Sequence, residues 1–175
     1  MTFEQLQQAL ARIRLVVLDA DGVLTDGGIY LGAEEELKRY DVRDGAGVKY
    51  LLRHGIAVAL ISGRESVSLA RRCEELGIIE IHQRQLQKLP VFLALVERLG
   101  VALEETAVVG DDLMELPLLR RAGLGIAVAD ACAELRRHAD WVTRAGGGRG
   151  AVREVAEAIL KAKGLWAQVM ERYLA

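Results

Sequence analysis

The sequence has little of the residue types that nucleic-acid-binding proteins use. Aromatic residues make up only 5% of the 175-residue chain, which argues against a stacking platform for single strands. The chain also has no excess of positive charge, because 23 Lys+Arg and 25 Asp+Glu give a net charge of −2. No run of basic residues concentrates the positive charge in one segment. We therefore expect no nucleic-acid partner.

Cysteine and long apolar segments are also in short supply. Cys73 and Cys132 form no CxxC pair and have no zinc-site spacing with histidine, so we expect two reduced thiols. The first fourteen residues lack the apolar centre of a signal peptide. The longest apolar run, Gly55–Ile61, is far shorter than the roughly 20 residues that a membrane span needs. These features predict a cytoplasmic protein with no membrane partner.

What the chain does have is a regular alternation of short apolar runs and amphipathic segments. With 51% hydrophobic residues and the length of one domain, residues 1–175 are expected to form a single globular unit. The alternation predicts an α/β fold, a Rossmann-like parallel sheet with helices on both faces. The predicted strands are Leu15–Leu18, Ile56–Ile61, Ile78–Ile81, Thr106–Val109, Gly125–Val128 and Trp141–Thr143. The predicted helices are Gly47–His54, Glu65–Leu76, Leu89–Leu99, Leu113–Arg121, Ala131–His138, Arg149–Lys163 and Leu165–Tyr173.

One segment breaks this rhythm. Residues Gly28–Val42 read as two short strands joined by a turn near 32–35, which predicts a β-hairpin standing off the main sheet. The acidic stretch Glu34–Glu36 is interpreted as solvated hairpin surface.

Carboxylates follow the first predicted strand directly. Asp19 stands at its carboxyl end, where open α/β sheets bind ligands, and Asp21 comes two residues later. Two carboxylates this close repel each other unless a cation lies between them, and oxygen ligands suit Mg²⁺. An isolated pair of this kind is also compatible with a simple capping turn.

Three further segments place polar groups at the same edge of the sheet. Ser62 and Gly63 follow the second strand and offer a hydroxyl and backbone N–H groups to an anion, although Ser62 alone is compatible with an ordinary helix cap. Lys88 precedes a helix, where a lone lysine is usually solvated, and Asp111 with Asp112 ends the fourth strand. Together they predict one cleft for a divalent metal and a phosphate.

These segments carry a specific resemblance. Asp19-x-Asp21-Gly22-Val23-Leu24-Thr25, Ser62, Lys88 and Gly110-Asp111-Asp112 resemble the four motifs of the haloacid dehalogenase superfamily of phosphotransferases. The segments DADGVLTDGGIYLG, YDVRDGAGVKYL, ISGRES, GDDLMELPLL and ADWVTRAGGGRGAVREV narrow this to its phosphatases for 3-deoxy-D-manno-octulosonate 8-phosphate, a sugar-acid phosphate of lipopolysaccharide biosynthesis. The implied activity is phosphomonoester hydrolysis.

The resemblance also implies a role for each motif residue. Asp19 would attack phosphorus to form an aspartyl-phosphate, and Asp21 would act as general acid and then general base. Mg²⁺ would be held by Asp19, the Asp21 carbonyl group and Asp111, with Asp112 acting on metal-bound water. The phosphoryl oxygens would be bound by Ser62, Gly63 and Lys88.

Two residues depart from the pattern of the resemblance. Glu115 stands where the superfamily often has aspartate, and it predicts altered geometry around the metal without loss of the metal. Cys132 stands where histidine is expected, and it predicts a change in packing or in a contact on the substrate side.

The spacing of the motifs leaves no room for a cap domain over the cleft. Only about forty residues separate Asp21 from Ser62, and capless relatives usually close the cleft with a neighbouring subunit. The resemblance therefore implies a homotetramer assembled through the hairpins. Arg64 and Arg149 are candidates for binding the substrate carboxylate, because a guanidinium pairs with a carboxylate through two hydrogen bonds; surface salt bridges are the alternative for both.

Two other functions remain open from the sequence. One is a phosphatase for a nine-carbon sugar-acid 9-phosphate, because the motifs bind metal and phosphate whatever the length of the sugar. The other is a non-enzymatic receiver domain with a phosphorylated aspartate. The position of Asp19 on the first strand and the nearby carboxylate of Asp21 argue against the receiver.

Overall fold

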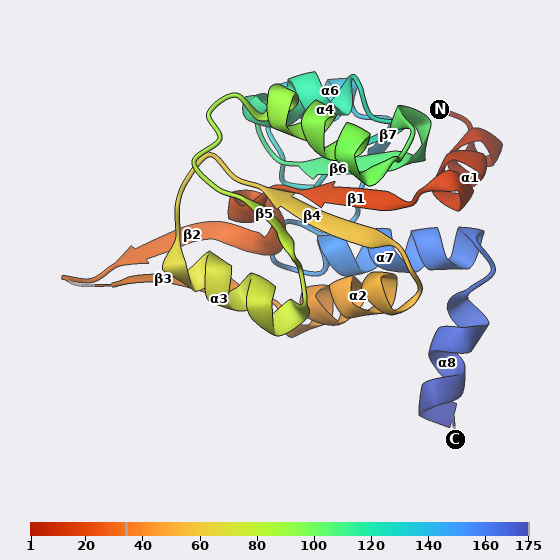
Figure 1. The fold of residues 1–175 in the computed structure, drawn as a ribbon, viewed down its shortest axis with the longest axis horizontal. Helices are drawn as coiled ribbons and strands as arrows, with labels where there is room; N and C mark the ends of the chain where they lie inside the picture. Colours follow the sequence, from red (N-terminus) through yellow and green to blue (C-terminus); the bar gives the residue numbers. More distant parts are fainter. Residues whose placement is uncertain (34, 175) are drawn as a thin grey trace.

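The centre of the molecule is a parallel sheet, which confirms the predicted fold class. The computed structural model describes residues 1–33 and 35–174. In the described part, six strands pair in the order β5-β4-β1-β6-β7-β8, all parallel (Figure 1). They are β1 (Leu15–Leu18), β4 (Ala57–Ile61), β5 (Glu80–His82), β6 (Thr106–Gly110), β7 (Leu124–Ala127) and β8 (Trp141–Val142).

The central strands form because their side chains are apolar on both faces. Every residue of β1, β6 and β7 is buried, which is the pattern of a strand covered on both sides by helices. The register aligns Leu18 of β1 with Leu60 of β4 and with Val109 of β6, so these three strands end at the same edge. That edge carries the predicted site residues.

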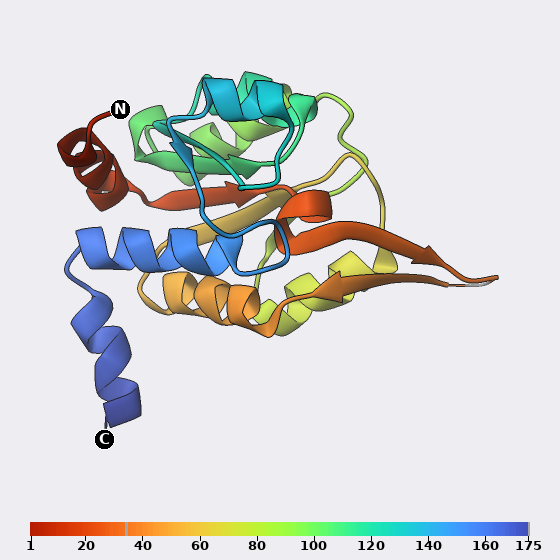
Figure 2. The same cartoon turned by 180° about the vertical axis from the view of Figure 1, so that it is seen from behind.

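Helices cover both faces of the sheet. Figures 1 and 2 show α4 and α6 on one face and α2, α3 and α7 on the other, with α8 extending away at the C-terminus. The helices are α1 (Phe3–Arg12), α2 (Val42–Arg53), α3 (Val67–Leu76), α4 (Lys88–Leu99), α5 (Leu116–Leu119), α6 (Ala133–His138), α7 (Ala151–Ala162) and α8 (Trp166–Leu174). Short turns lie at η1 (Ala20–Leu24), η2 (Leu103–Glu105) and η3 (Leu113–Glu115).

The predicted hairpin is present with shifted bounds. It consists of β2 (Thr25–Leu31) and β3 (Glu36–Tyr40), and it projects from the body of the molecule (Figure 1). The prediction of residues 28–42 began too late and ended too late, because β2 follows directly on η1 and Val42 already belongs to α2. Between β1 and β4 the described residues form only η1, the hairpin and α2, which confirms that no cap domain lies there.

Helix α2 begins five residues before its predicted start. The Asp41 side chain accepts a hydrogen bond from the Arg43 N–H and caps the helix at Val42. Gly45 and Gly47 made this start hard to predict, because glycine disfavours helix. At Gly47, however, a Cβ would lie 3.0 Å from Arg153 Cα on α7, so the two helices approach closely at this glycine. Close packing of α2 on α7 therefore stabilises a helix that the local sequence does not favour.

A glycine-rich segment, 146–150, lies against the turn η1. The Gly148 N–H donates to the Val23 carbonyl oxygen at 2.9 Å, and a Cβ on Gly147 would collide with the Gly22 carbonyl group. The segment is held from the other side by the fully buried Asp44, which accepts hydrogen bonds from the N–H groups of Gly150 and Arg153 at 3.0 and 2.9 Å. The backbone after β1 is thus supported by a second backbone segment.

The sequence predicts no membrane span and two reduced thiols. Among the residues described, no helix is both long enough and apolar enough to cross a membrane. Cys73 and Cys132 are both free thiols, and burial raises the pKa of Cys73 to about 11.

Candidate active site

A cleft of about 220 Å³ opens at the carboxyl edge of the sheet. It brings together all of the predicted site residues except Arg149, although they come from four separate segments of the chain. Its lining is Asp19, Asp21, Ser62, Gly63, Arg64, Lys88, Asp111, Asp112, Met114 and Glu115. The cleft is the meeting point of the ends of β1, β4 and β6 with the start of α4.

The turn after β1 needs glycine at one position. Gly22 has φ +83°, a conformation that L side chains rarely adopt, and a Cβ there would collide with the Asp111 carboxylate. The chain can therefore leave Asp19 in a sharp turn while Asp111 approaches its backbone closely. The turn brings the first and fourth motifs into contact.

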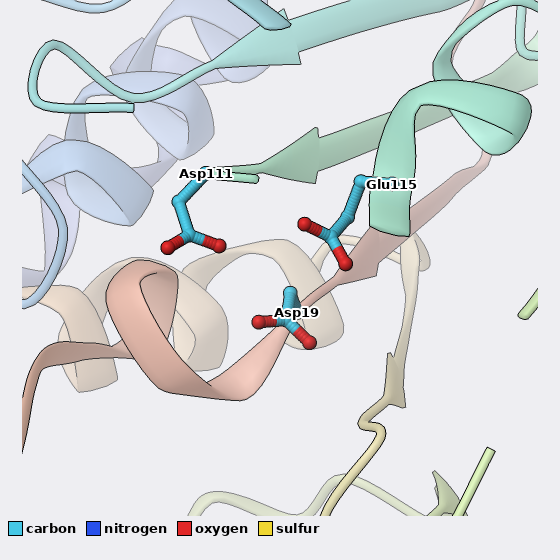
Figure 3. Close-up of side chains that lie close together, drawn as sticks. All are labelled: Asp19, Asp111 and Glu115. Atoms are coloured by element: carbon cyan, nitrogen blue, oxygen red, sulfur yellow. The ribbon is translucent and has the colours of Figure 1, made fainter. Parts of the chain in front are cut away.

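Three carboxylates converge in the cleft. Asp19, Asp111 and Glu115 each offer an oxygen within 4.8 Å of the others, and Figure 3 shows them pointing toward one another. Burial raises the pKa of Asp19 to about 6, and the charge of Glu115 adds to this. Burial and then the charge of Asp19 raise the pKa of Asp111 to about 7. The site therefore holds more negative charge than its own cations neutralise.

Lys88 is buried and directed at two of these carboxylates. Its Nζ lies 2.5 Å from Asp19 Oδ1 and 2.5 Å from Glu115 Oε1, and the residue is only 4% exposed. Burial would lower the pKa of Lys88, but the two carboxylates outweigh burial and raise it. Lys88 therefore lies in the cleft as predicted, and the general rule that a lone lysine is solvated does not hold here.

The surplus charge lies on Asp19 and Asp111. Glu115 has both oxygens engaged, one by Lys88 and the other by the Asp112 N–H at 3.1 Å. Asp111 has no salt bridge among the described residues, and Asp19 shares Lys88 with Glu115. A hard divalent cation fits the Asp19 and Asp111 oxygens, because it would stabilise the ionised form of both.

The loop after β4 differs in one respect from its prediction. Ser62 lies in the cleft, and its hydroxyl accepts the Arg64 N–H at 3.3 Å. The following helix begins only at Val67 and is capped by Ser66, so Ser62 is not its cap and the helix N-terminus does not lie directly at Gly63. The anion donors here belong to a loop.

Asp21 has two cationic neighbours. Arg64 Nε lies 3.7 Å from Asp21 Oδ2, and Lys38 Nζ lies 2.7 Å from Asp21 Oδ1. Lys38 was not among the predicted site residues; the available signal was the alternation in β3, which puts Glu36 and Lys38 on one face of the strand. Glu36 is half-buried and pairs with Arg64 at 2.9 Å, which the prediction of solvated surface did not foresee, whereas Glu35 is exposed as predicted and Glu34 lies outside the described residues.

Arg149 and Cys132 lie at the edge of this arrangement. Arg149 does not line the cleft, and its guanidinium is 3.9 Å from Asp26. The Cys132 N–H donates to the Asp111 carbonyl oxygen at 2.7 Å, and the thiol accepts the Leu135 N–H at 3.4 Å as the cap of α6. Cys132 thus supports Asp111 through its backbone.

The fold and this cleft define a class of protein. Residues 74–152 match the family of haloacid dehalogenase-like hydrolases. This match, with a nucleophile candidate directly after the first strand of a parallel sheet and carboxylates directly after a neighbouring strand, places the chain among the hydrolases of that superfamily.

Relatives identify the family within that class. The 3-deoxy-D-manno-octulosonate 8-phosphate phosphatase KdsC of Escherichia coli (strain K12) is 50% identical over 153 residues, which are 87% of this chain and 81% of the relative. The phosphatase of the same name from Moraxella catarrhalis, solved with magnesium, phosphate and KDO, has a TM-score of 0.95 at 40% identity and covers 98% and 99% of the two chains. The Yersinia pestis phosphatase gives 0.92 at 44% identity, covering 94% and 89%. The chain belongs to the KdsC phosphatase family, which removes the receiver-domain alternative.

Proposed function

We propose that this protein hydrolyses 3-deoxy-D-manno-octulosonate 8-phosphate to the free sugar acid and phosphate, in the cytoplasm, as a step of lipopolysaccharide biosynthesis. The observation that carries the proposal is the cleft, in which Asp19, Asp21 and Lys88 meet the carboxylates of the fourth motif. The relatives that are 40–50% identical and bear this activity in their names support the choice of substrate.

The first half of the reaction uses Asp19 and Asp21. A carboxylate oxygen of Asp19 attacks phosphorus, and the bond between phosphorus and the sugar oxygen breaks. Asp21 gives its proton to the departing sugar oxygen as a general acid. The products of this step are the free sugar acid, an aspartyl-phosphate on Asp19 and an ionised Asp21.

The second half restores the enzyme. A water oxygen attacks the phosphorus of the aspartyl-phosphate, and its proton passes to Asp21 as general base. The bond between phosphorus and Asp19 breaks, which releases inorganic phosphate and regenerates the Asp19 carboxylate. Asp21 ends protonated, ready for the next cycle.

Mg²⁺ fits the surplus negative charge of this cleft. The residues that would hold it are Asp19, Asp111 and the carbonyl group of Asp21, with the Asp112 carboxylate close by. When bound, Mg²⁺ supplies positive charge that reduces the repulsion between a carboxylate nucleophile and a phosphate dianion. The Moraxella structure with magnesium and phosphate supports this assignment.

Substrate binding is assigned to the loop after β4 and to Lys88. Ser62, the Gly63 N–H and Lys88 bind the phosphoryl oxygens, and Arg64 binds the carboxylate of the sugar acid. Arg149 is outside the cleft of its own chain, so its assigned contact with substrate requires a neighbouring subunit or movement of the segment 146–150.

Assembly into a homotetramer would supply such a neighbour. The hairpin exposes large apolar side chains that a lone chain leaves in water: Tyr30 is 63%, Leu31 77% and Leu37 55% exposed. Contiguous apolar surface of this kind favours an interface. We propose that hairpins of four subunits pack together and cover these side chains.

The test is phosphate release from a panel of phosphate esters, with and without Mg²⁺. We expect the highest kcat/KM for the eight-carbon sugar acid 8-phosphate, and loss of activity in EDTA. A higher kcat/KM for a nine-carbon sugar-acid 9-phosphate would show that the nine-carbon ester is the substrate. A wild-type protein inactive on every ester would overturn the proposed function.

A further inference from the structure

The hairpin inserts a buried ammonium group into the cleft region. The side chain of Lys38, on β3, is 0% exposed, and its Nζ lies 2.7 Å from Asp21 Oδ1. A fully buried lysine side chain is rare in proteins unless it is paired with an acidic group, so its partner indicates its role. Here the partner is the proposed general acid and base.

Lys38 belongs to a closed ring of alternating charges. Its Nζ is also 3.4 Å from Glu36 Oε1, Glu36 Oε2 accepts a hydrogen bond from Arg64 at 2.9 Å, and Arg64 Nε lies 3.7 Å from Asp21 Oδ2. Three separate segments therefore meet around Asp21: the turn η1, strand β3 and the loop after β4. The ring fixes the direction from which Lys38 reaches Asp21.

This arrangement makes the two oxygens of Asp21 unequal. Oδ1 accepts the hydrogen bond from Lys38, whereas Oδ2 is buried and has no hydrogen-bond partner among the residues that the structure describes. A buried carboxylate oxygen without a hydrogen bond is destabilising, and such atoms are found at functional sites. Oδ2 is the oxygen whose hydrogen-bonding capacity is unused, and it lies shielded from solvent beside Arg64.

We propose that Lys38 is a positioning residue for Asp21: by holding Oδ1, it aims Oδ2 at the proton that Asp21 donates and then takes back. This inference rests on the proposed function. General acid–base catalysis requires the catalytic oxygen within hydrogen-bond reach of the proton, and a misplacement of about 1 Å can cost about 100-fold in rate. The position of the hairpin strand thereby sets the orientation of a catalytic group.

Stability alone does not account for this contact. Replacing a buried ion pair by apolar groups of similar volume is often neutral or stabilising, whereas the geometry of the pair is lost. Lys38→Met removes the ammonium and keeps most of the volume, but it leaves Asp21 and Glu36 without this partner, so a lowered melting temperature is expected. Circular dichroism and the melting temperature check this before any rate is compared.

The decisive experiment is a double-mutant cycle between Lys38→Met and Asp21→Asn. In the wild-type background we expect Lys38→Met to lower kcat for the sugar-acid phosphate roughly 10- to 100-fold with little change in KM. In the Asp21→Asn background the same substitution is expected to change kcat less than about threefold, because the group that Lys38 positions is already disabled. Equal fold-losses in the two backgrounds would overturn the proposal.

A second readout separates positioning from general damage. p-Nitrophenyl phosphate has a good leaving group, so its first step needs little acid catalysis and hydrolysis of the aspartyl-phosphate becomes limiting. With this ester, Lys38→Met is expected to raise the fraction of phosphorylated enzyme trapped by an acid quench. The matched control is Arg39→Met on the same strand, whose side chain contacts Asp26 and the Gly148 carbonyl oxygen and not Asp21; its trapped fraction is expected to equal that of wild type.

The failures can be told apart. A wild-type protein that hydrolyses the sugar-acid phosphate, together with additive effects and an unchanged trapped fraction in Lys38→Met, overturns the role of Lys38 and leaves the proposed function standing. A wild-type protein without phosphatase activity overturns both.

Discussion

The ammonium of Lys88 lies 2.5 Å from Oε1 of Glu115. The Glu115 side chain reaches Lys88 with one oxygen and the Asp112 N–H with the other. Glu115 thus joins the start of α4 to the turn after β6, and it shares with Asp19 the only cation that contacts either carboxylate among the described salt bridges.

Removing the charge of Glu115 should therefore be harmful. Glu115→Gln leaves the buried Lys88 with one carboxylate, and we expect kcat to fall about tenfold, because a charge-assisted hydrogen bond is lost in a buried site. Glu115→Asp keeps the charge and is expected to retain activity within about threefold. Steady-state kinetics on the two variants check this; equal activity of both with wild type would contradict it.

Replacing the nucleophile should abolish turnover. Asp19→Asn substitutes a poor nucleophile, so kcat is expected to fall by more than about 100-fold while the circular dichroism spectrum is unchanged. Acid-quenched samples with ³²P-labelled substrate should carry label on the wild-type protein and none on the variant. Retained turnover above about one hundredth of wild type would contradict a covalent mechanism through Asp19.

Metal binding should weaken as the pH falls. Burial holds the pKa of Asp111 at about 7 and that of Asp19 at about 6, so protons compete with Mg²⁺ for both below neutrality. Each group lowers the affinity by up to about tenfold per pH unit below its pKa. Calorimetric titrations with Mg²⁺ at pH 8, 7, 6 and 5 measure this, and an affinity independent of pH would contradict it.

The same carboxyl groups set the stability of the metal-free protein. Both pKa values are raised in the folded state, so the folded protein holds protons that the unfolded chain releases near pH 4. Their contribution to stability is therefore present at low pH and is lost as the pH rises toward 6 and 7. The increase in melting temperature on adding Mg²⁺ is expected to grow between pH 5 and pH 8, and Asp111→Asn is expected to reduce that growth.

Arg64 should distinguish substrates by their carboxylate. Arg64→Ala is expected to raise KM for the sugar-acid phosphate about tenfold or more, and to change KM for p-nitrophenyl phosphate little, since that ester has no carboxylate. The effect of Arg149→Ala on both KM values serves as a comparison, because the guanidinium of Arg149 lies outside the cleft of its own chain. Equal effects of Arg64→Ala on both esters would assign Arg64 to the phosphate instead.

The exposed hairpin should assemble. Light scattering is expected to give roughly four times the 19.2 kDa mass of the chain. Leu31→Asp puts a charge on the most exposed of the large apolar residues of the hairpin and is expected to shift the protein to smaller species with lower activity. A fully active monomer would contradict closure of the cleft by a neighbouring subunit.

The strands of the sheet were predictable because each is a short apolar run, and every residue of β1, β6 and β7 is buried, whereas β5 and β8 at the edges are only partly buried. For the same reason the sequence placed Asp19, Ser62 and Asp111 at one edge: parallel strands share a direction, so the residues after them meet. The order and direction of the strands were sufficient to predict that these residues lie close together.

Contacts between distant segments were not predictable from local patterns. Lys38 looks like a surface lysine in the sequence, but its side chain is buried beside carboxylates of Asp21 and Glu36. Lys88 was predicted to lie in the cleft, but its contact with Glu115 was not. The start of α2 was missed for a similar reason, since Gly45 and Gly47 disfavour helix locally and only packing on neighbouring elements stabilises it.

The contact between the glycine segment and η1 has a consequence for how the protein tolerates change. At Gly147 and Gly148 an added Cβ would strike the backbone of Gly22 and of Thr25, where no side chain can rotate away. A saturation-mutagenesis library selected for phosphatase activity should therefore be depleted at positions 147 and 148 almost as severely as at Asp19. Gly147 and Gly148 take no part in the chemistry, but they would be almost as intolerant of substitution as Asp19. Any side chain at these positions would displace the backbone of the turn that follows Asp19.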